Sequence, residues 1–144
     1  MARYTNMDFL KFLLFEVHPI KDLFQYERFA HLDEEQTWMM IESAKLLADQ
    51  EMAPYFKDMD ENPVKYDGNG NVLTHPCLKR IITESASQGW IGASANFEHG
   101  GMQLPEMIFS TAHHIFQAAN NGVEGYLGLS AGAAGLITLS LIHI

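Results

Sequence analysis

Hydrophobic residues recur every three to four positions in several stretches of the chain, which is the spacing of an amphipathic helix. The first such stretch covers residues 8–17 and ends at His18-Pro19, since a residue before proline is disfavoured in the α region. Residues 20–29 repeat the pattern weakly. The pattern therefore predicts a short helix followed by a second segment that is either helix or an irregular arm.

The clearest helix signal begins at Asp33, whose carboxylate can cap free backbone N–H groups. Gln36 stands where a capping box places its second member, and Glu34 and Glu35 favour the positive end of a helix. Pro54 is expected to kink or end this helix near Ala53. Its predicted apolar face consists of Trp38, Ile41, Ala44, Leu47, Ala48, Met52 and Tyr55.

A turn rich in glycine and asparagine at residues 67–70 separates two short stretches, 64–66 and 71–74, which predicts a β-hairpin. The same turn superficially matches a calcium loop through Asp67, Asn69 and Asn71. Val72 and Leu78, however, occupy the positions of the required glycine and the bidentate glutamate, so calcium binding is rejected.

Three further helices are predicted after the hairpin. Pro76 suits the first turn of a helix and Gly89 a left-handed C-cap, with Leu78, Ile81, Ile82 and Ala86 facing inward. Residues 90–103 show no helical period and are predicted to form an extended connection. The next helix starts at 104–106 and ends at 120–122, and a last helix covers 123–137. The predicted inner face of the helix that starts at 104–106 consists of Ile108, Thr111, Ala112, Ile115, Phe116 and Ala119. The fold class predicted is all-α with one short hairpin.

Composition and charge narrow the function classes. The 144 residues are 47% hydrophobic and 19% charged, which is typical of a globular domain, and the single cysteine excludes a disulfide scaffold. We therefore expect a reducing, cytoplasmic location. A formal charge of −9 repels phosphate backbones, so no nucleic-acid partner is expected. No lysine or arginine follows Arg80.

The two ends of the chain bear on targeting and membrane insertion. Asp8 and Lys11 interrupt the first apolar stretch, so no secretory signal is predicted. Residues 125–144 carry no formal charge and include Gly128-x-x-x-Gly132, a spacing that also occurs between membrane helices. Glycines, serines, a threonine and a histidine dilute this stretch, which favours a helix buried within a larger protein over a membrane span.

Few side chains suggest chemistry directly. Gly128-x-Ser130-x-Gly132 matches a nucleophile elbow, which would make Ser130 the nucleophile of a hydrolase, but only His143 follows and no carboxylate does. Adjacent His113 and His114 point in different directions on a helix, so one packed and one exposed histidine are expected and no metal site. The acidic residues Asp58, Asp60 and Glu61 are interpreted as a solvated helix end.

Three sequence segments together resemble the N-terminal α-helical domain of acyl-CoA dehydrogenases. They are Trp90-Ile-Gly92-Ala-Ser94, then Phe97-Glu98-His99-Gly100-Gly101, and, after a proline-initiated helix, Asn120-Asn121-Gly122-Val123. The helix from Asp33, with Ala48-Asp49-Gln-Glu51 and Pro54, also looks like that family's first long helix. Ala95 or Asn96 replaces a proline that is common in the family pattern.

The resemblance implies a division of the chain into three parts. Residues 1–32 look like an N-terminal extension of one subfamily, residues 33–137 like the helical domain, and residues 138–144 depart from the family. The last segment is interpreted as extraneous sequence on a truncated product.

The resemblance also implies the function of the complete enzyme. That enzyme would use FAD to convert a fatty acyl-CoA into a trans-2-enoyl-CoA, would pass electrons to an electron-transfer flavoprotein, and would form a homo-oligomer. The family's catalytic base and flavin contacts lie beyond this domain, so no catalytic residue is assigned here. By position, the resemblance assigns the wall of the acyl-chain cavity to Glu124, Tyr126, Leu127, Ser130 and Ala131, with Tyr126 and Leu127 as the expected contacts of the hydrocarbon.

An alternative of a different class is a small helical interaction or membrane-associated module. In that interpretation the apolar C-terminal end docks on a partner or a bilayer.

Overall fold

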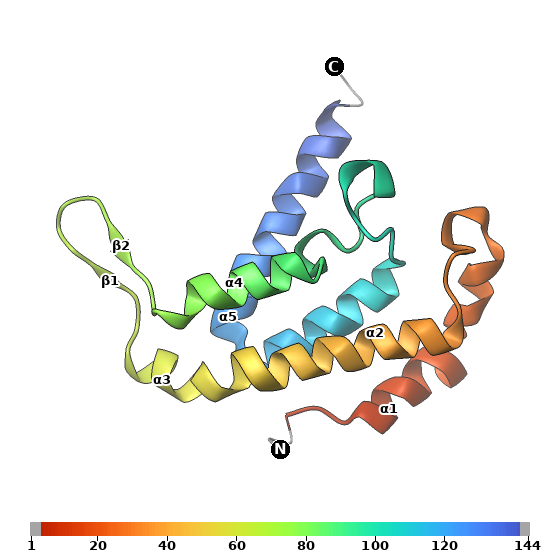
Figure 1. Ribbon diagram of the computed structural model, residues 1–144, viewed down its shortest axis with the longest axis horizontal. Helices are drawn as coiled ribbons and strands as arrows, with labels where there is room; N and C mark the ends of the chain where they lie inside the picture. Colours follow the sequence, from red (N-terminus) through yellow and green to blue (C-terminus); the bar gives the residue numbers. More distant parts are fainter. Residues whose placement is uncertain (1–3, 142–144) are drawn as a thin grey trace.

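The N-terminal part of the chain begins with a short helix and an irregular arm. The computed structural model describes residues 4–141 (Figure 1). Helix α1 (Met7–Phe12) starts after Asn6, whose side chain accepts a hydrogen bond from the Phe9 amide, and it widens into a π-helical turn, Leu13–Val17. The arm then forms two 3-10 turns, Ile20–Gln25 and Glu27–Phe29. The predicted first helix is confirmed, and the arm takes the irregular alternative.

The second helical region also begins where the sequence predicts. Asp33 caps helix α2 (Glu34–Leu47), and its Oδ1 accepts a hydrogen bond of 2.7 Å from the Gln36 amide. Past α2 the backbone continues through a π-helical turn, Ala48–Met52, and a 3-10 turn, Ala53–Tyr55. The helical path thus changes to a 3-10 turn at Ala53, where Pro54 was expected to kink or end the helix, although the regular α-helix already ends at Leu47. The chain then continues as helix α3 (Phe56–Glu61).

The predicted hairpin is present and projects from the helices between α3 and α4 (Figure 1). Strands β1 (Lys65–Tyr66) and β2 (Val72–Leu73) pair antiparallel. The Asp67 carboxylate accepts hydrogen bonds from the amides of Asn69 and Asn71 at 2.7 and 3.0 Å, and from the Asn71 side chain at 2.7 Å. These bonds lower the pKa of Asp67 and close the turn internally.

Helix α4 (Cys77–Ser87) follows Pro76, and just beyond its end Gly89 adopts a left-handed φ of 81° as predicted. One residue of its predicted inner face is wrong: Ala86 is exposed, and Ser85 is buried instead. Positions 78, 81 and 85 share one helix face, and this is the face that packs inward.

The connection of residues 90–103 is not the extended segment that was predicted. It contains two 3-10 turns, Trp90–Gly92 and Phe97–His99, and a left-handed Gly100 at φ 77°. Trp90 is buried and packs edge-on against Phe116, with ring centroids 5.8 Å apart. A buried aromatic anchor thus fixes one end of a segment that has no helical period of its own.

Helix α5 (Glu106–Leu141) is two helices joined at a break. Asn120 has non-helical backbone angles (φ −162°, ψ 92°), which places the break where Asn120-Asn121-Gly122 predicts it. Asn120 is buried, and its side-chain amide donates to the Met52 carbonyl at 3.2 Å. We call residues 121–141 the last helix. It continues beyond the predicted end at 137, and residues 142–144 of the predicted tail lie outside the described part.

The core lies between α2, α4 and the first half of α5. The face predicted for α5 is confirmed, with Thr111 half-buried and the other five residues buried. The principal buried side chains are Ile41, Ala44, Leu47, Leu78, Ile81, Ile108, Ala112, Ile115 and Phe116.

The last helix leaves this core and extends away from the other helices (Figure 1). Its outer residues Leu129, Leu136 and Ile137 are 77%, 71% and 62% exposed. Within residues 4–141 no helix combines the length and hydropathy needed to span a membrane. The predicted fold class, all-α with one short hairpin, is confirmed.

Candidate substrate-binding groove

A groove of about 420 Å³ lies between the connection 91–99 and the last helix. On one side it is lined by Ile91, Gly92, Ser94, Ala95, Asn96 and His99, and on the other by Ser130, Ala131, Ala134, Gly135 and Thr138. Its size falls in the usual range for small-molecule pockets, roughly 300–1,000 Å³. The two segments that form it are both parts of the family resemblance.

Glycines determine the shape of the connection. Gly100 adopts the left-handed conformation, and a Cβ on Gly101 would lie 2.1 Å from the carbonyl oxygen of Ala95. That close approach allows the Asn96 carbonyl to accept hydrogen bonds from the amides of His99 and Gly101, both at 3.0 Å. The two adjacent glycines are therefore required by geometry, the first by its φ and the second by space.

The groove side of the last helix is made of small residues. The hydroxyl of Ser130 donates to the Tyr126 carbonyl at 2.9 Å, and that of Thr138 to the Ala134 carbonyl at 3.0 Å. Both hydroxyls are thus bonded to their own helix. This wall offers mainly methyl groups and a glycine, which suits an apolar ligand that approaches closely.

Ser130 is not placed as the nucleophile of a hydrolase. It lies in the middle of a helix, whereas the nucleophile elbow requires a strained turn between a strand and a helix. The structure gives a different reason for the first glycine of the Gly128-x-Ser130-x-Gly132 pattern. A Cβ on Gly128 would lie 2.7 Å from Glu124 Oε1, so this glycine makes room for a carboxylate.

That carboxylate belongs to a polar cluster that spans the break in α5. Glu124 Oε1 lies 2.8 Å from His113 Nδ1, and Glu124 Oε2 accepts a hydrogen bond of 3.1 Å from Gln117. The side chains of His113 and Glu124 are only 10% and 12% exposed. His113 is packed and His114 exposed, which confirms the prediction for that pair. Glu124 thereby joins the last helix to the helix before it.

The five predicted wall residues are separated by the structure. Ser130 and Ala131 line the groove, whereas Tyr126 lines a neighbouring cavity of about 240 Å³ with Phe56, Met59 and other residues near the hairpin. Leu127 is fully buried in the core. Glu124 points toward His113. Two of the five therefore face the groove, and the other three do not line it.

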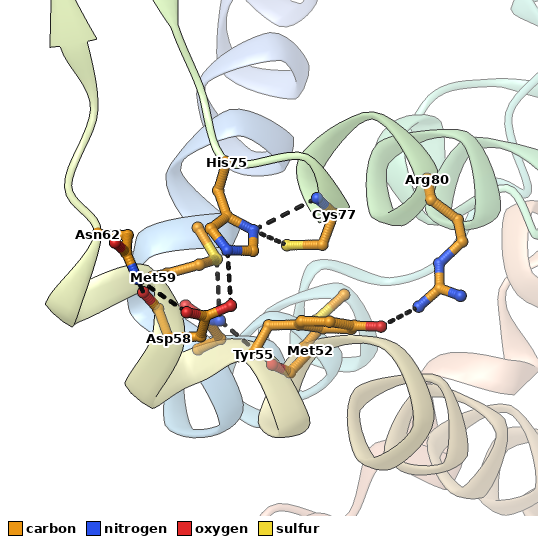
Figure 2. Close-up of polar contacts among 9 residues, drawn as sticks. Met52, Tyr55, Asp58, Met59, Asn62, His75, Cys77 and Arg80 are labelled. Atoms are coloured by element: carbon orange, nitrogen blue, oxygen red, sulfur yellow. Dashed lines mark hydrogen bonds and ion pairs between the residues drawn. The ribbon is translucent and has the colours of Figure 1, made fainter.

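A second polar cluster was missed at the sequence level because its members come from different elements (Figure 2). His75 Nδ1 lies 2.8 Å from Cys77 Sγ, and His75 Nε2 lies 2.9 Å from Asp58 Oδ2. The Cys77 amide also donates to Nδ1 at 3.3 Å, which makes Nδ1 an acceptor and places the ring proton on Nε2. Asp58, Asp60 and Glu61 are all exposed, as predicted for a solvated helix end, but Asp58 in addition has a specific partner in His75.

This Cys-His-Asp arrangement does not have the chemistry of a nucleophile. Burial raises the pKa of the Cys77 thiol, whereas reactive cysteines have a lowered pKa and an exposed sulfur. The three residues instead connect α3 to the start of α4. Beside them Arg80 donates to the Tyr55 hydroxyl at 2.7 Å, a further link between the same parts of the chain (Figure 2).

No group of three or more histidine, cysteine or acidic side chains that could hold a metal ion occurs among the described residues. The candidate site is therefore the groove itself, whose lining suits binding more than catalysis.

Comparison with known proteins indicates a distant relation to one class of proteins. No family model matches the chain. A curated relative supports a distant relation to the acyl-CoA dehydrogenases. That relative is the broad-specificity linear acyl-CoA dehydrogenase FadE5 of Mycobacterium tuberculosis, 26% identical over 130 residues, which cover 89% of this chain and 21% of the relative. The chain thus spans about a fifth of the length of the curated relative that it matches.

Proposed function

We propose that this chain is the N-terminal helical domain of a FAD-dependent acyl-CoA dehydrogenase, and that its groove forms part of the acyl-chain wall. The observation that carries the proposal is the groove between the connection 91–99 and the small-residue face of the last helix. The distant match to an acyl-CoA dehydrogenase supports the same class. In this proposal residues 33–137 form the domain and residues 1–32 precede it as an extension.

Within the groove the proposal assigns roles to particular side chains. Ser130 and Ala131 form the wall that contacts the hydrocarbon, because both line the groove and Ser130 directs its hydroxyl to its own helix. Leu127 supports that wall from the core, and Glu124 fixes the angle of the helix through His113. Tyr126 belongs to the adjoining cavity.

The groove fits a hydrocarbon and does not fit a flavin dinucleotide. A dinucleotide requires partners for its phosphates, and neither wall contains a lysine or arginine. In the complete enzyme FAD would accept a hydride from the β-carbon of the substrate. We assign no residue of this chain to that step and expect the flavin, the electron-transfer flavoprotein and other subunits to be contacted elsewhere.

Binding of dodecanoyl-CoA tests the proposed groove. We expect titration into the ¹⁵N-labelled chain to shift the amide resonances of Ser94, Asn96, Ser130 and Ala134, while coenzyme A alone does not. An Ala134→Phe variant places a ring in the groove and should weaken binding about tenfold or more, which corresponds to about 1.4 kcal/mol.

The matched control is Ala86→Phe, which adds the same ring to an exposed position of α4 that does not line the groove. It should bind like the unaltered chain. Shifts confined to residues around the Tyr126 cavity, or equal binding by both variants, would show that the groove is not the acyl site.

A second prediction concerns the chain by itself. Because neither the flavin site nor the catalytic base is assigned to it, the purified chain should hold no stoichiometric FAD and should not reduce an electron-accepting dye with dodecanoyl-CoA. Absorbance near the flavin bands and a dye-reduction assay measure this. A yellow protein with acyl-CoA-dependent activity contradicts the assignment of those functions to other parts of the enzyme.

A further inference from the structure

The N-terminal arm contacts the connection that forms one wall of the groove. Arg28 Nη2 donates a hydrogen bond of 2.6 Å to Asn96 Oδ1, and the Gln103 side chain donates one of 2.7 Å to the Arg28 carbonyl. The rings of His31 and Phe97 meet edge-on, with centroids 4.8 Å apart. Three contacts therefore join residues 28–31 to residues 96–103.

These contacts reach an exposed part of the connection. Phe97 is 55% exposed, and the segment around it is neither helix nor strand, apart from one 3-10 turn. Gln103 adopts a positive φ of 51°, a conformation that is unfavourable for a residue with a side chain. Its bond to the Arg28 carbonyl, together with that of its own amide to the Ala95 carbonyl at 2.9 Å, offsets this cost.

Arg28 is suited to this contact by its charge and geometry. A guanidinium is always protonated and presents several donors in a fixed plane, so it forms shorter and stronger hydrogen bonds than a neutral donor. Its acceptor, Asn96, is itself a lining residue of the groove. The Arg28 side chain thereby links the arm directly to a lining residue of the groove.

We propose that Arg28 is a positioning residue that holds Asn96 and the segment 95–103 in the arrangement that forms the groove. The proposal rests on the proposed function only in the identity of the ligand, an acyl chain. The arm then determines how firmly one wall of the groove is held, and with it the affinity for the chain that occupies the groove.

Hydrogen exchange tests the positioning role without any ligand. In an Arg28→Ala variant we expect the amides of Gly101 and Gln103, which bond to the Asn96 and Ala95 carbonyls, to exchange about threefold to tenfold faster. Arg28→Lys keeps a charged donor and should recover part of the protection. The control is Arg80→Ala, because Arg80 is also hydrogen-bonded and half-exposed but lies on the Tyr55 side of the molecule.

Affinity for dodecanoyl-CoA provides the second measurement. Arg28→Ala should weaken binding about threefold or more, and Arg80→Ala should leave it unchanged. Unchanged exchange in Arg28→Ala would overturn the positioning role, and faster exchange with unchanged affinity would overturn its connection to the groove. If the unaltered chain does not bind the probe while exchange responds as expected, the acyl-groove function fails and the positioning role remains.

Discussion

Replacing Gly101 with alanine is expected to lower the free energy of unfolding by about 3 kcal/mol, the upper part of the range for overpacking. The added Cβ would lie 2.1 Å from the carbonyl oxygen of Ala95 and 2.4 Å from its carbonyl carbon. Both are backbone atoms, so the clash can be relieved only by moving the chain. Urea unfolding followed by circular dichroism measures the change.

Two neighbouring glycines are matched controls for this prediction. A Cβ on Gly92 or Gly100 meets nothing within 4 Å, and only Gly100 has a positive φ. Gly92→Ala should therefore be nearly neutral, and Gly100→Ala should cost about 1 kcal/mol for the strained backbone. Equal free energies of unfolding for the three variants would show that a side chain at position 101 does not clash with the Ala95 backbone.

Replacing Glu124 with alanine is expected to cost about 2–4 kcal/mol, because it leaves a buried histidine without its partner. His113 Nδ1 loses its 2.8 Å contact, and Nε2, which is buried, already has no hydrogen-bond partner. The control is Glu106→Ala, an exposed acidic residue in the first turn of α5, for which a loss of about 0.5 kcal/mol is expected.

Gly128 provides a second measurement of the same pair. A Cβ at this position would lie 2.7 Å from Glu124 Oε1, so Gly128→Ala should destabilise the chain when Glu124 is present and much less in the Glu124→Ala background. Additive effects of the two substitutions would contradict the proposed contact. If Glu124→Ala lowers the free energy of unfolding by less than about 1 kcal/mol, the contact of Glu124 with His113 contributes little to stability across the break in α5.

The predictions for Gly101 and Glu124 concern different walls of the groove. Gly101 determines the fold of the connection, and Glu124 determines how the last helix is joined to the helix before it. If both hold, each wall of the groove depends on a residue outside its lining, Gly101 for one wall and Glu124 for the other, just as Asn96 depends on Arg28.

The sequence predicts the boundaries of elements where the determining interaction is local. The Asp33 cap involves residues three positions apart, the Gly89 cap depends on a single φ, and the hairpin turn depends on side chains within residues 67–71. The sequence does not predict the structure of the 90–103 connection, because its turns depend on Trp90 packing against Phe116 and on the close approach of Gly101 to Ala95.

The candidate site shows the same division. Small residues and the absence of cations in the last helix were visible in the sequence, as was the Gly100-Gly101 pattern of the opposite wall. Which residues face the groove was not visible, because the rotation of the last helix depends on the break at Asn120 and on the pair of Glu124 with His113. That rotation directs Ala131 into the groove and Leu127 into the core.

By itself the sequence determined where α2 and α4 start and where α5 breaks, because capping and backbone preferences act over a few residues. Tertiary structure alone decided which faces meet: it brought Arg28 to Asn96 and Asp58 to His75, and it separated Tyr126 from Ser130 into different cavities. The physical reason is that such contacts depend on the relative placement of whole elements, to which residues far apart in the chain contribute jointly.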